Sequence, residues 1–223
     1  MNSSIRGFIF DLDGVIVDTA HHHFLSWRQL ADQLGFEIPD TLDHDLKGLG
    51  RMESLEKVLV YRNEETPKSE WADLAARKNA MYLEEISHLS AGDTLPGVIE
   101  FLESARDSGL ALAIGSGSKN ARPILTTLGI SDRFNAICDG TDITRSKPDP
   151  EVFQCACSKL GISPSEAVVF EDAKSGVEAA RSMGAFVVGI GSADQLGDAN
   201  LLLPSLEGIT ANDILKKLPE HAA

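Results

Sequence analysis

Five short apolar segments, each ending abruptly in a polar loop, constrain the fold of this chain more than any other feature. They are residues 7–10, 110–114, 135–138, 167–170 and 185–190. Amphipathic helical patterns separate most of these segments, at residues 98–108, 121–128, 150–160 and 175–183. Continuous apolar strands that alternate with such helices are typical of a parallel sheet covered on both faces. The sequence therefore predicts an α/β chain whose working residues gather at the carboxyl ends of the strands.

Residues 19–91 interrupt this alternation. They carry helical periodicity, both tryptophans and no convincing strand, and their predicted helices cover residues 19–35, 43–47, 51–62 and 68–87. A segment rich in turn-forming residues, 92–97, then returns the chain to the sheet. We therefore expect a parallel-sheet domain formed by residues 1–18 and 92–223, with a helical domain formed by residues 19–91 inserted into it.

The composition limits the partners of the chain. Its net charge of −14 argues against nucleic-acid or anionic-membrane binding, because phosphate binding needs clustered Lys and Arg. Apolar residues make up 43% of the sequence and supply a core that needs no disulfide or structural metal. The three cysteines, Cys138, Cys155 and Cys157, lack a C-x-x-C spacing and are expected to be buried thiols. With no apolar signal segment or membrane span in the sequence, we expect a cytoplasmic, monomeric protein.

Paired carboxylates follow two of the predicted strands. Asp11 and Asp13 leave the first strand, with Gly14 allowing a sharp turn. Two carboxylates this close repel each other, which favours a cation beside them, although an isolated D-x-D pattern is also found in loops with capping aspartates. Glu171 and Asp172 add two more carboxylates at the same sheet edge. Such hard oxygen ligands favour Mg²⁺, so the predicted metal-site residues are Asp11, Asp13, Glu171 and Asp172.

Further residues at this edge indicate phosphoryl transfer. Ser116 and Gly117 offer a hydroxyl and backbone N–H groups that could cradle a phosphate, and Lys147 precedes a proline. Mg²⁺ on one side, with Lys147 and Ser116 on the other, would offset the repulsion between an attacking carboxylate and a phosphate. We predict that Asp11 is the nucleophile and that Asp13 is the general acid and base.

The order of these groups resembles that of the haloacid dehalogenase-like superfamily of phosphotransferases over essentially the whole chain. The resemblance rests on Asp11-x-Asp13, Ser116, Lys147 and Glu171-Asp172, each after a strand. It implies a Rossmann-like core with an inserted α-helical cap that determines the substrate. It also implies Mg²⁺ held by Asp11, the backbone carbonyl of Asp13, and Asp172, with Glu171 beside the site. Asp13 argues against dehalogenase chemistry.

The cap resembles that of the β-phosphoglucomutase family. The resemblance rests on residues 18–20 with His23 and Trp27, on residues 46–51 with Ser54, on residues 76–79, and on residues 116–120 of the core. It implies that Arg51 binds the phosphate distant from the reaction, helped by Ser118, Lys119 and Asn120. The implied substrate-binding residues are Thr19, His23, Trp27, Lys47, Gly48, Arg51, Ser54, Lys78, Ser118, Lys119 and Asn120. Glycines at 115 and 117 replace the alanines more common in that family, which predicts a looser phosphate loop.

Simpler interpretations remain for the cap residues. His23 and Trp27 are four residues apart and would form one packing stripe on a helix. Arg51 alone is typical of a solvated helix start, and Lys78 lies in a charged stretch. The consecutive histidines 21–23 would diverge around a helix axis, which disfavours metal chelation.

The function implied by the resemblance is the Mg²⁺-dependent interconversion of β-glucose 1-phosphate and glucose 6-phosphate. A phosphorylated Asp11 would donate to the sugar and give β-glucose 1,6-bisphosphate, which serves as both intermediate and activator. The partner would therefore be a small phosphorylated sugar. A sugar-phosphate phosphatase would need the same core residues, so the core does not separate the two activities. A non-catalytic phosphosugar-binding protein would have no need for both Asp11 and Asp13.

Overall fold

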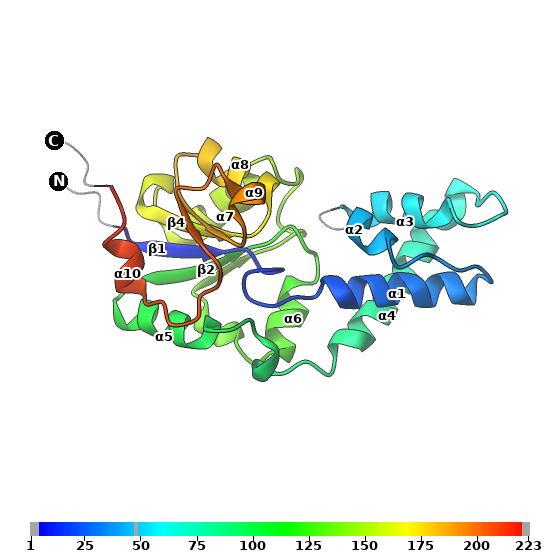
Figure 1. Ribbon diagram of the computed structural model, residues 1–223, viewed down its shortest axis with the longest axis horizontal. Helices are drawn as coiled ribbons and strands as arrows, with labels where there is room; N and C mark the ends of the chain where they lie inside the picture. Colours follow the sequence, from blue (N-terminus) through cyan, green and yellow to red (C-terminus); the bar gives the residue numbers. More distant parts are fainter. Residues whose placement is uncertain (1–4, 47–48, 220–223) are drawn as a thin grey trace. The chain divides into compact units, whose positions relative to one another are not determined.

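The computed structural model describes residues 5–46 and 49–219, and the chain divides into two compact units. We call residues 1–18 and 89–223 the sheet unit, and residues 19–88 the helical unit (Figure 1). The helical unit is therefore inserted between the first and second strands of the sheet unit, after Asp18. None of the helices in the described ranges is long and apolar enough to cross a membrane.

The sheet unit is built on a parallel sheet with strand order β3-β2-β1-β4-β5-β6. The strands are β1 (Gly7–Phe10), β2 (Ala111–Gly115), β3 (Ala136–Cys138), β4 (Ala167–Glu171), β5 (Phe186–Ile190) and β6 (Leu201–Leu203). This is the order of the Rossmann fold, and the α/β prediction is confirmed. Strand β6 was not predicted, because three partly exposed residues at a sheet edge are too short to produce a recognisable pattern.

Helices cover both faces of this sheet (Figure 1). They are α5 (Val98–Asp107), α6 (Ala121–Thr127), α7 (Glu151–Leu160), α8 (Lys174–Ser182), α9 (Ala193–Leu196) and α10 (Ala211–Leu215). Because side chains alternate along a strand, Phe8 packs against Phe101 of α5, while Ile9 joins the core formed with α7 and α8. The short helices α9 and α10 were not predicted.

The helical unit contains α1 (Ala20–Gln33), α2 (Leu42–Leu46), α3 (Arg51–Leu59) and α4 (Trp71–Ile86). Its own apolar core includes Phe24 and Leu30 of α1, Leu55 of α3 and Leu74 of α4. Helix α3 ends three residues earlier than predicted, and the predicted start of the last helix is a separate 3₁₀ turn. The 3₁₀ turns of the chain are η1 (Lys68–Glu70), η2 (Ala91–Asp93), η3 (Ser131–Arg133) and η4 (Pro164–Glu166).

Two of the three cysteines differ from the prediction of buried thiols. Cys138, at the end of β3, is paired with Cys155 of α7 in a disulfide whose Cα atoms are 6.1 Å apart. Cys157 is free and buried, as predicted. The prediction was wrong for the pair because the two residues are 17 positions apart in sequence, and only the packing of α7 against β3 brings their sulfurs together.

Candidate active site

Three polar residues stand at or just beyond the carboxyl ends of adjacent strands of the sheet. Strand β1 pairs with β2 on one side and with β4 on the other. In this register, Phe10 of β1 lies opposite Ile114 of β2 and Phe170 of β4. Asp11 follows Phe10 directly, Glu171 follows Phe170 as the last residue of β4, and Ser116 comes just after Gly115, the last residue of β2. The backbone N–H of Asp11 donates to the Phe170 carbonyl at 2.9 Å. The strand order reverses between β1 and β4, which is where open α/β sheets bind their ligands. Asp11 therefore lies at the position that this fold favours for a site.

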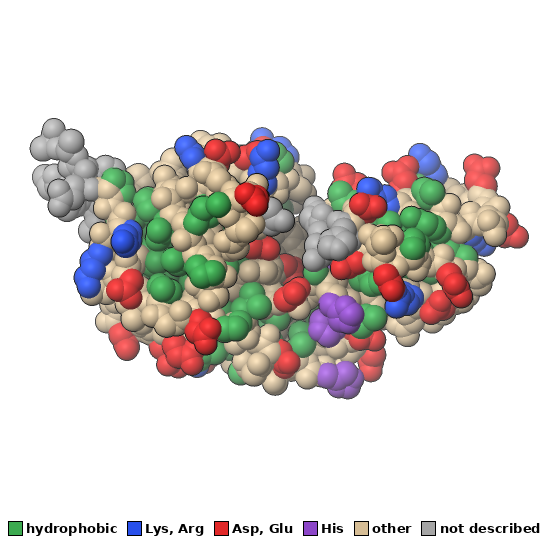
Figure 2. Space-filling view, in the orientation of Figure 1, with side chains coloured by type: hydrophobic (Ala, Val, Ile, Leu, Met, Phe, Trp, Pro, Cys, Tyr) green, Lys and Arg blue, Asp and Glu red, His purple; other side chains and the backbone are tan. Residues whose placement is uncertain are grey.

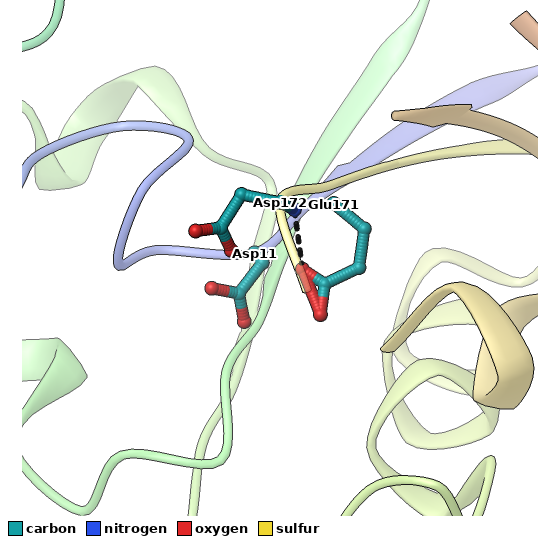
Figure 3. A group of neighbouring side chains, drawn as sticks. All are labelled: Asp11, Glu171 and Asp172. Atoms are coloured by element: carbon teal, nitrogen blue, oxygen red, sulfur yellow. Dashed lines mark hydrogen bonds between the residues drawn. The ribbon is translucent and has the colours of Figure 1, made fainter. Parts of the chain in front are cut away.

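Three carboxylates converge beside this point. Ligand atoms of Asp11, Glu171 and Asp172 all lie within 4.8 Å of one another (Figure 3). Burial raises the pKa of Asp172 to about 7, and the negative charges of Asp11 and Asp13 contribute to the rise. Burial also raises the pKa of Glu171. Burial and mutual repulsion therefore disfavour the state in which all of these carboxylates are ionised.

Lys147 is the cation in contact with this cluster. Its Nζ lies 2.5 Å from Asp11 Oδ1 and 3.2 Å from Glu171 Oε1. The ammonium also lies over the ring of Phe153, 4.6 Å from the centroid. Burial disfavours the charged form of Lys147, but attraction to Asp11 and Glu171 outweighs it and raises the pKa above its usual value. Lys147 therefore stays protonated and offsets part of the negative charge.

Two glycines allow the carboxylates to approach. Gly14 has a φ of +83°, and a Cβ there would overlap the carboxylate of Asp172. A Cβ at Gly176 in α8 would likewise overlap the carboxylate of Glu171. The missing Cβ at both positions therefore lets a carboxylate lie against the backbone. At Gly14, glycine also allows a left-handed backbone conformation that other residues rarely adopt.

The loop after β2 is held by side-chain to backbone hydrogen bonds. The N–H of Ser118 donates to Ser116 Oγ at 3.1 Å, and the N–H of Asn120 donates to Ser118 Oγ at 3.2 Å. Ser116 and Asn120 are buried, whereas Gly117 and Lys119 are exposed. These bonds give the predicted phosphate loop a defined conformation.

Gly115 does not loosen this loop, contrary to the prediction. It lies inside β2, and a Cβ there would be 2.7 Å from Cδ1 of Phe153. The glycine thus lets Phe153 lie close to the sheet, beneath Lys147. A Cβ at Gly117 would meet no heavy atom within 4 Å beyond its chain neighbours in the described part of the chain, so no close approach explains that glycine.

In the helical unit, buried Lys78 and partly buried His23 form a polar pair. Lys78 Nζ lies 2.6 Å from His23 Nδ1, and it sits 4.9 Å from the ring centroids of both Trp27 and Tyr82. Burial, followed by the charges of Lys78 and Arg51, lowers the pKa of His23 to about 3. Neutral His23 therefore accepts from the ammonium through Nδ1 and carries its own proton on Nε2.

Tyr82, which was not predicted, and the predicted cap residues Thr19 and Trp27 lie around this pair. Tyr82 stacks on the ring of His23 with centroids 3.9 Å apart, and its hydroxyl donates to Oγ1 of buried Thr19 at 3.0 Å. Trp27 belongs to the apolar core of the helical unit, as the packing interpretation held. The structure therefore gives Trp27 a packing role, and its ring also contacts the Lys78 ammonium.

Arg51 begins helix α3 and is half-buried. Its Nη2 donates to Asn79 Oδ1 of α4 at 2.7 Å. Ser54, one turn further along α3, is buried and its N–H donates to the carbonyl of Gly50. Lys47 and Gly48 lie outside the described residues, so their predicted roles remain predictions.

Comparison with known proteins identifies the family. The sequence model of the haloacid dehalogenase-like hydrolases matches residues 8–190, which is most of the chain. The chain belongs to this family. It is 38% identical over 208 residues to "Beta-phosphoglucomutase" of Bacillus subtilis, covering 92% of each chain. It is 30% identical over 203 residues to "Validoxylamine A 7'-phosphate phosphatase" of Streptomyces hygroscopicus, covering 89% of this chain and 92% of that protein.

A solved structure supports the same assignment. The crystal structure of β-phosphoglucomutase from Clostridium difficile has a TM-score of 0.86 and 37% sequence identity to this chain, with 96% of each chain covered. The chain is therefore a phosphotransferase or hydrolase of the haloacid dehalogenase-like type, and its relatives act on small phosphorylated sugars.

The acidic cluster fits the Mg²⁺ ion of this family. Its donors are hard carboxylate oxygens, and its excess negative charge contributes to the raised pKa of Asp172. Glu171 already accepts from Lys147 through Oε1 and from the N–H of Asp172 through Oε2. Asp11 also accepts from Lys147, through Oδ1. We therefore expect Asp11 and Asp172 to hold the ion, with Glu171 and Lys147 beside it.

Adding Mg²⁺ to the metal-free protein is expected to raise its unfolding temperature by about 5–10 °C. A ligand at roughly 100 times its dissociation constant adds about 2.7 kcal/mol of stability, and a chain of this size shifts by about 2–4 °C per kcal/mol. Calorimetric unfolding with and without Mg²⁺ would measure the shift. Asp172→Asn should remove most of it, whereas Asp107→Asn, an exposed carboxylate on α5, should retain it. An equal shift in both variants would contradict the assigned site.

Three residues that lie against predicted site residues, within one unit or the other, are not evident from the sequence. Phe153 resembles an ordinary apolar residue of a helix, Tyr82 resembles part of the cap core, and Gly176 lies inside a helical pattern. For Gly176 a signal does exist, because a glycine inside a helical pattern usually has a packing or functional reason. For Phe153 and Tyr82, nothing in the sequence indicates that a cation lies over the ring.

Proposed function

We propose that this chain is a Mg²⁺-dependent β-phosphoglucomutase, acting as a monomer in the cytoplasm. It would interconvert β-glucose 1-phosphate and glucose 6-phosphate through a phosphorylated Asp11 and β-glucose 1,6-bisphosphate. One observation carries the proposal: each unit has its own cationic group. Lys147 contacts Asp11 in the sheet unit, while Arg51 and Lys78 both act electrostatically on His23 in the helical unit. A bisphosphate intermediate has two phosphates to bind.

In the proposed reaction, β-glucose 1,6-bisphosphate is attacked at one phosphorus by Asp11. Its carboxylate bonds to phosphorus while the bond from phosphorus to the sugar oxygen breaks, and Asp13 gives a proton to that oxygen. In the return step, Asp13 takes the proton from a hydroxyl of β-glucose 1-phosphate while its oxygen bonds to phosphorus and the bond from phosphorus to Asp11 breaks, which regenerates the bisphosphate. Lys147 and the Ser116 loop offset the charge that develops on the phosphoryl oxygens. When bound, Mg²⁺ would supply Lewis-acid stabilisation of the same charge.

The helical unit would act as the cap that selects the sugar. Arg51 would hold the phosphate that is not reacting, through a bidentate contact that lysine cannot reproduce. Ser118, Lys119 and Asn120 of the core would assist it. Thr19, His23, Trp27, Lys47, Gly48, Ser54 and Lys78 would line the sugar pocket or couple cap closure to Asp13. Closure would exclude water, which otherwise competes for the phosphorylated aspartate.

The surface charge supports a small substrate rather than a polyanion. On the face drawn in Figure 2, the coloured Lys and Arg side chains are interspersed with Asp and Glu and form no continuous basic patch among the described residues. Nucleic-acid binding depends on such a patch to displace counterions. This face therefore gives no support to nucleic-acid binding, and the proposed partner is the small phosphorylated sugar of the reaction above.

A sugar-phosphate phosphatase is the second candidate, because a relative named as a phosphatase is 30% identical to this chain. It would use Asp11, Asp13, Ser116, Lys147 and Asp172 in the same way but transfer the phosphoryl group to water. One coupled assay separates the two activities. The protein is given β-glucose 1-phosphate, Mg²⁺ and a catalytic amount of the bisphosphate, and glucose 6-phosphate and free phosphate are measured together. Phosphate release without isomerisation would overturn the mutase proposal.

Arg51→Ala is expected to lower mutase turnover about 10- to 100-fold, because a hydrogen bond to a charged group contributes about 1.5–3 kcal/mol. Hydrolysis of a small activated ester such as acetyl phosphate should change little, since that donor has no second phosphate. Arg77→Ala is the matched control, because Arg77 is partly buried like Arg51 and lies on α4, where its Nη2 donates to Gln33 Oε1 at 3.0 Å. Equal loss of both activities in Arg51→Ala would instead assign Arg51 to the fold of the helical unit.

A further inference from the structure

The carboxylate of Glu151 joins the start of the loop that carries Lys147 to the start of helix α7. Glu151, the first residue of α7, reaches back to residues 144 and 145 at the start of the loop. Its Oε1 accepts from the N–H of Thr144 at 3.1 Å, and its Oε2 accepts from the N–H of Arg145 at 2.7 Å. The Thr144 hydroxyl donates to both oxygens at 3.1 Å, and Arg145 Nε donates to Oε2 at 3.3 Å.

The other side of the loop is tied to the same segment. Asp149 Oδ1 accepts from the N–H of Glu151 at 3.0 Å, and Asp149 Oδ2 pairs with Arg145 Nη1 at 3.0 Å. The N–H of Asp149 in turn donates to the carbonyl of Ser146 at 3.0 Å. Residues 144–151 therefore form a closed ring of hydrogen bonds, and Lys147 lies within it. The bonds to Glu151, led by that from the N–H of Thr144, lower its pKa and keep it an acceptor.

Helix α7 also carries the surface on which Lys147 rests. Phe153, two residues beyond Glu151, is fully buried and lies beneath the Lys147 ammonium. The start of α7 therefore sets both the loop backbone and the apolar support of the lysine. A lysine side chain has four flexible carbons, so its contacts with Asp11 and Glu171 depend on where its backbone is held.

We propose that Glu151 is a positioning residue for phosphoryl transfer, acting through Lys147. By closing the loop, Glu151 holds the Lys147 ammonium at the oxygens of Asp11 and Glu171 before substrate arrives. The inference rests on the proposed function only in that Lys147 must stabilise the transferring phosphoryl group. The carboxylate of Glu151 bonds Thr144 and Arg145, and its effect on the acidic cluster passes through the loop.

Glu166 provides a matched control for the structural part of this role. Its Oε2 accepts from the N–H of Ser163 at 2.8 Å and from the Ser163 hydroxyl at 2.9 Å, so it closes a short turn in the same way. Glu166 directly precedes β4, whereas Glu171 and Asp172 stand at the end of that strand and just beyond it. Loss of the hydrogen bonds between Glu166 and Ser163 should lower folding stability without changing the position of Lys147.

The test compares Glu151→Gln and Glu151→Ala with Glu166→Gln and Glu166→Ala. Turnover of acetyl phosphate is measured together with KM, the unfolding temperature, and binding of orthovanadate as a probe of the phosphoryl transition state. Glu151→Ala is expected to lower kcat about 10- to 100-fold with KM changed less than about threefold, since small misplacements of a catalytic group have effects of this size. Glu151→Gln, which keeps one acceptor oxygen, should fall between wild type and Glu151→Ala. Vanadate binding should weaken in parallel with kcat.

The Glu166 variants should lose a similar amount of thermal stability while keeping kcat and vanadate binding. If Glu151→Ala matches Glu166→Ala in kcat and vanadate affinity, the positioning role is overturned and the proposed function stands. If wild-type protein shows no phosphoryl transfer from any sugar phosphate or from acetyl phosphate, the proposed function fails, and this role fails with it.

Discussion

Asp11→Asn is expected to abolish phosphoryl transfer, with turnover about 10⁴-fold or more below that of the wild type. An amide oxygen is a poor nucleophile, so the covalent step has no attacking group. The change also removes the charge that pairs with Lys147 at 2.5 Å. Transfer should be followed both as sugar-phosphate turnover and as labelling of the protein by a phosphoryl donor, because the first step alone already needs the carboxylate.

Asn and Asp have nearly the same size, which makes this variant informative. Far-ultraviolet circular dichroism should show an unchanged fold, and Asp107→Asn should keep both turnover and labelling. Residual turnover above about 1% of wild type, or labelling that persists in Asp11→Asn, would show that another group attacks phosphorus. Asp11 would then be only a ligand of the cation.

Lys147→Met is expected to lower turnover about 10²- to 10³-fold, the usual effect of removing one preorganised group that stabilises transition-state charge. It should also destabilise the metal-free protein by about 3–5 kcal/mol, because Asp11 and Glu171 lose the cation that pairs with them in a buried site. Mg²⁺ should restore part of this stability, since it offsets the same charges. Kinetics and urea unfolding, each with and without Mg²⁺, would measure both effects.

Lys159→Met is the control for the loss of a lysine from an ion pair. Lys159 lies on the surface of α7, where its Nζ pairs with Asp142 at 2.9 Å and its side chain is partly exposed. Exposed pairs contribute about 0–1 kcal/mol, so this variant should resemble wild type in stability and turnover. If Lys147→Met behaved like Lys159→Met, the buried cluster would be neutralised by another group and the assigned role of Lys147 would be wrong.

Much of the sheet unit could be predicted from local patterns. Each of the segments at 7–10, 110–114, 135–138, 167–170 and 185–190 overlaps a strand of the observed sheet. The reason is physical: a strand buried on both faces must be apolar throughout, so its ends are visible where polar residues begin. That rule also locates Asp11, Ser116 and Glu171 from the sequence alone. It misses β6, whose residues are partly exposed at the edge of the sheet.

The helical unit was predicted less closely. Periodicity identified its helices, but it extended the third helix past Leu59 and merged η1 with α4. Periodicity also left His23 and Lys78 with competing packing and binding interpretations. Their direct contact at 2.6 Å joins residues 55 positions apart, and no local pattern carries such a pairing.

The sequence by itself determined which segments form the sheet and which residues stand at the ends of its strands, because burial dictates composition along each strand. Only the tertiary structure decided which strands are neighbours, and therefore that Asp11 lies between Ser116 and Glu171. It alone brought Cys138 to Cys155, Phe153 beneath Lys147, and Glu151 to the loop that carries that lysine. These are contacts between side chains whose identities leave many partners open, and the packing of whole helices and strands selects one of them.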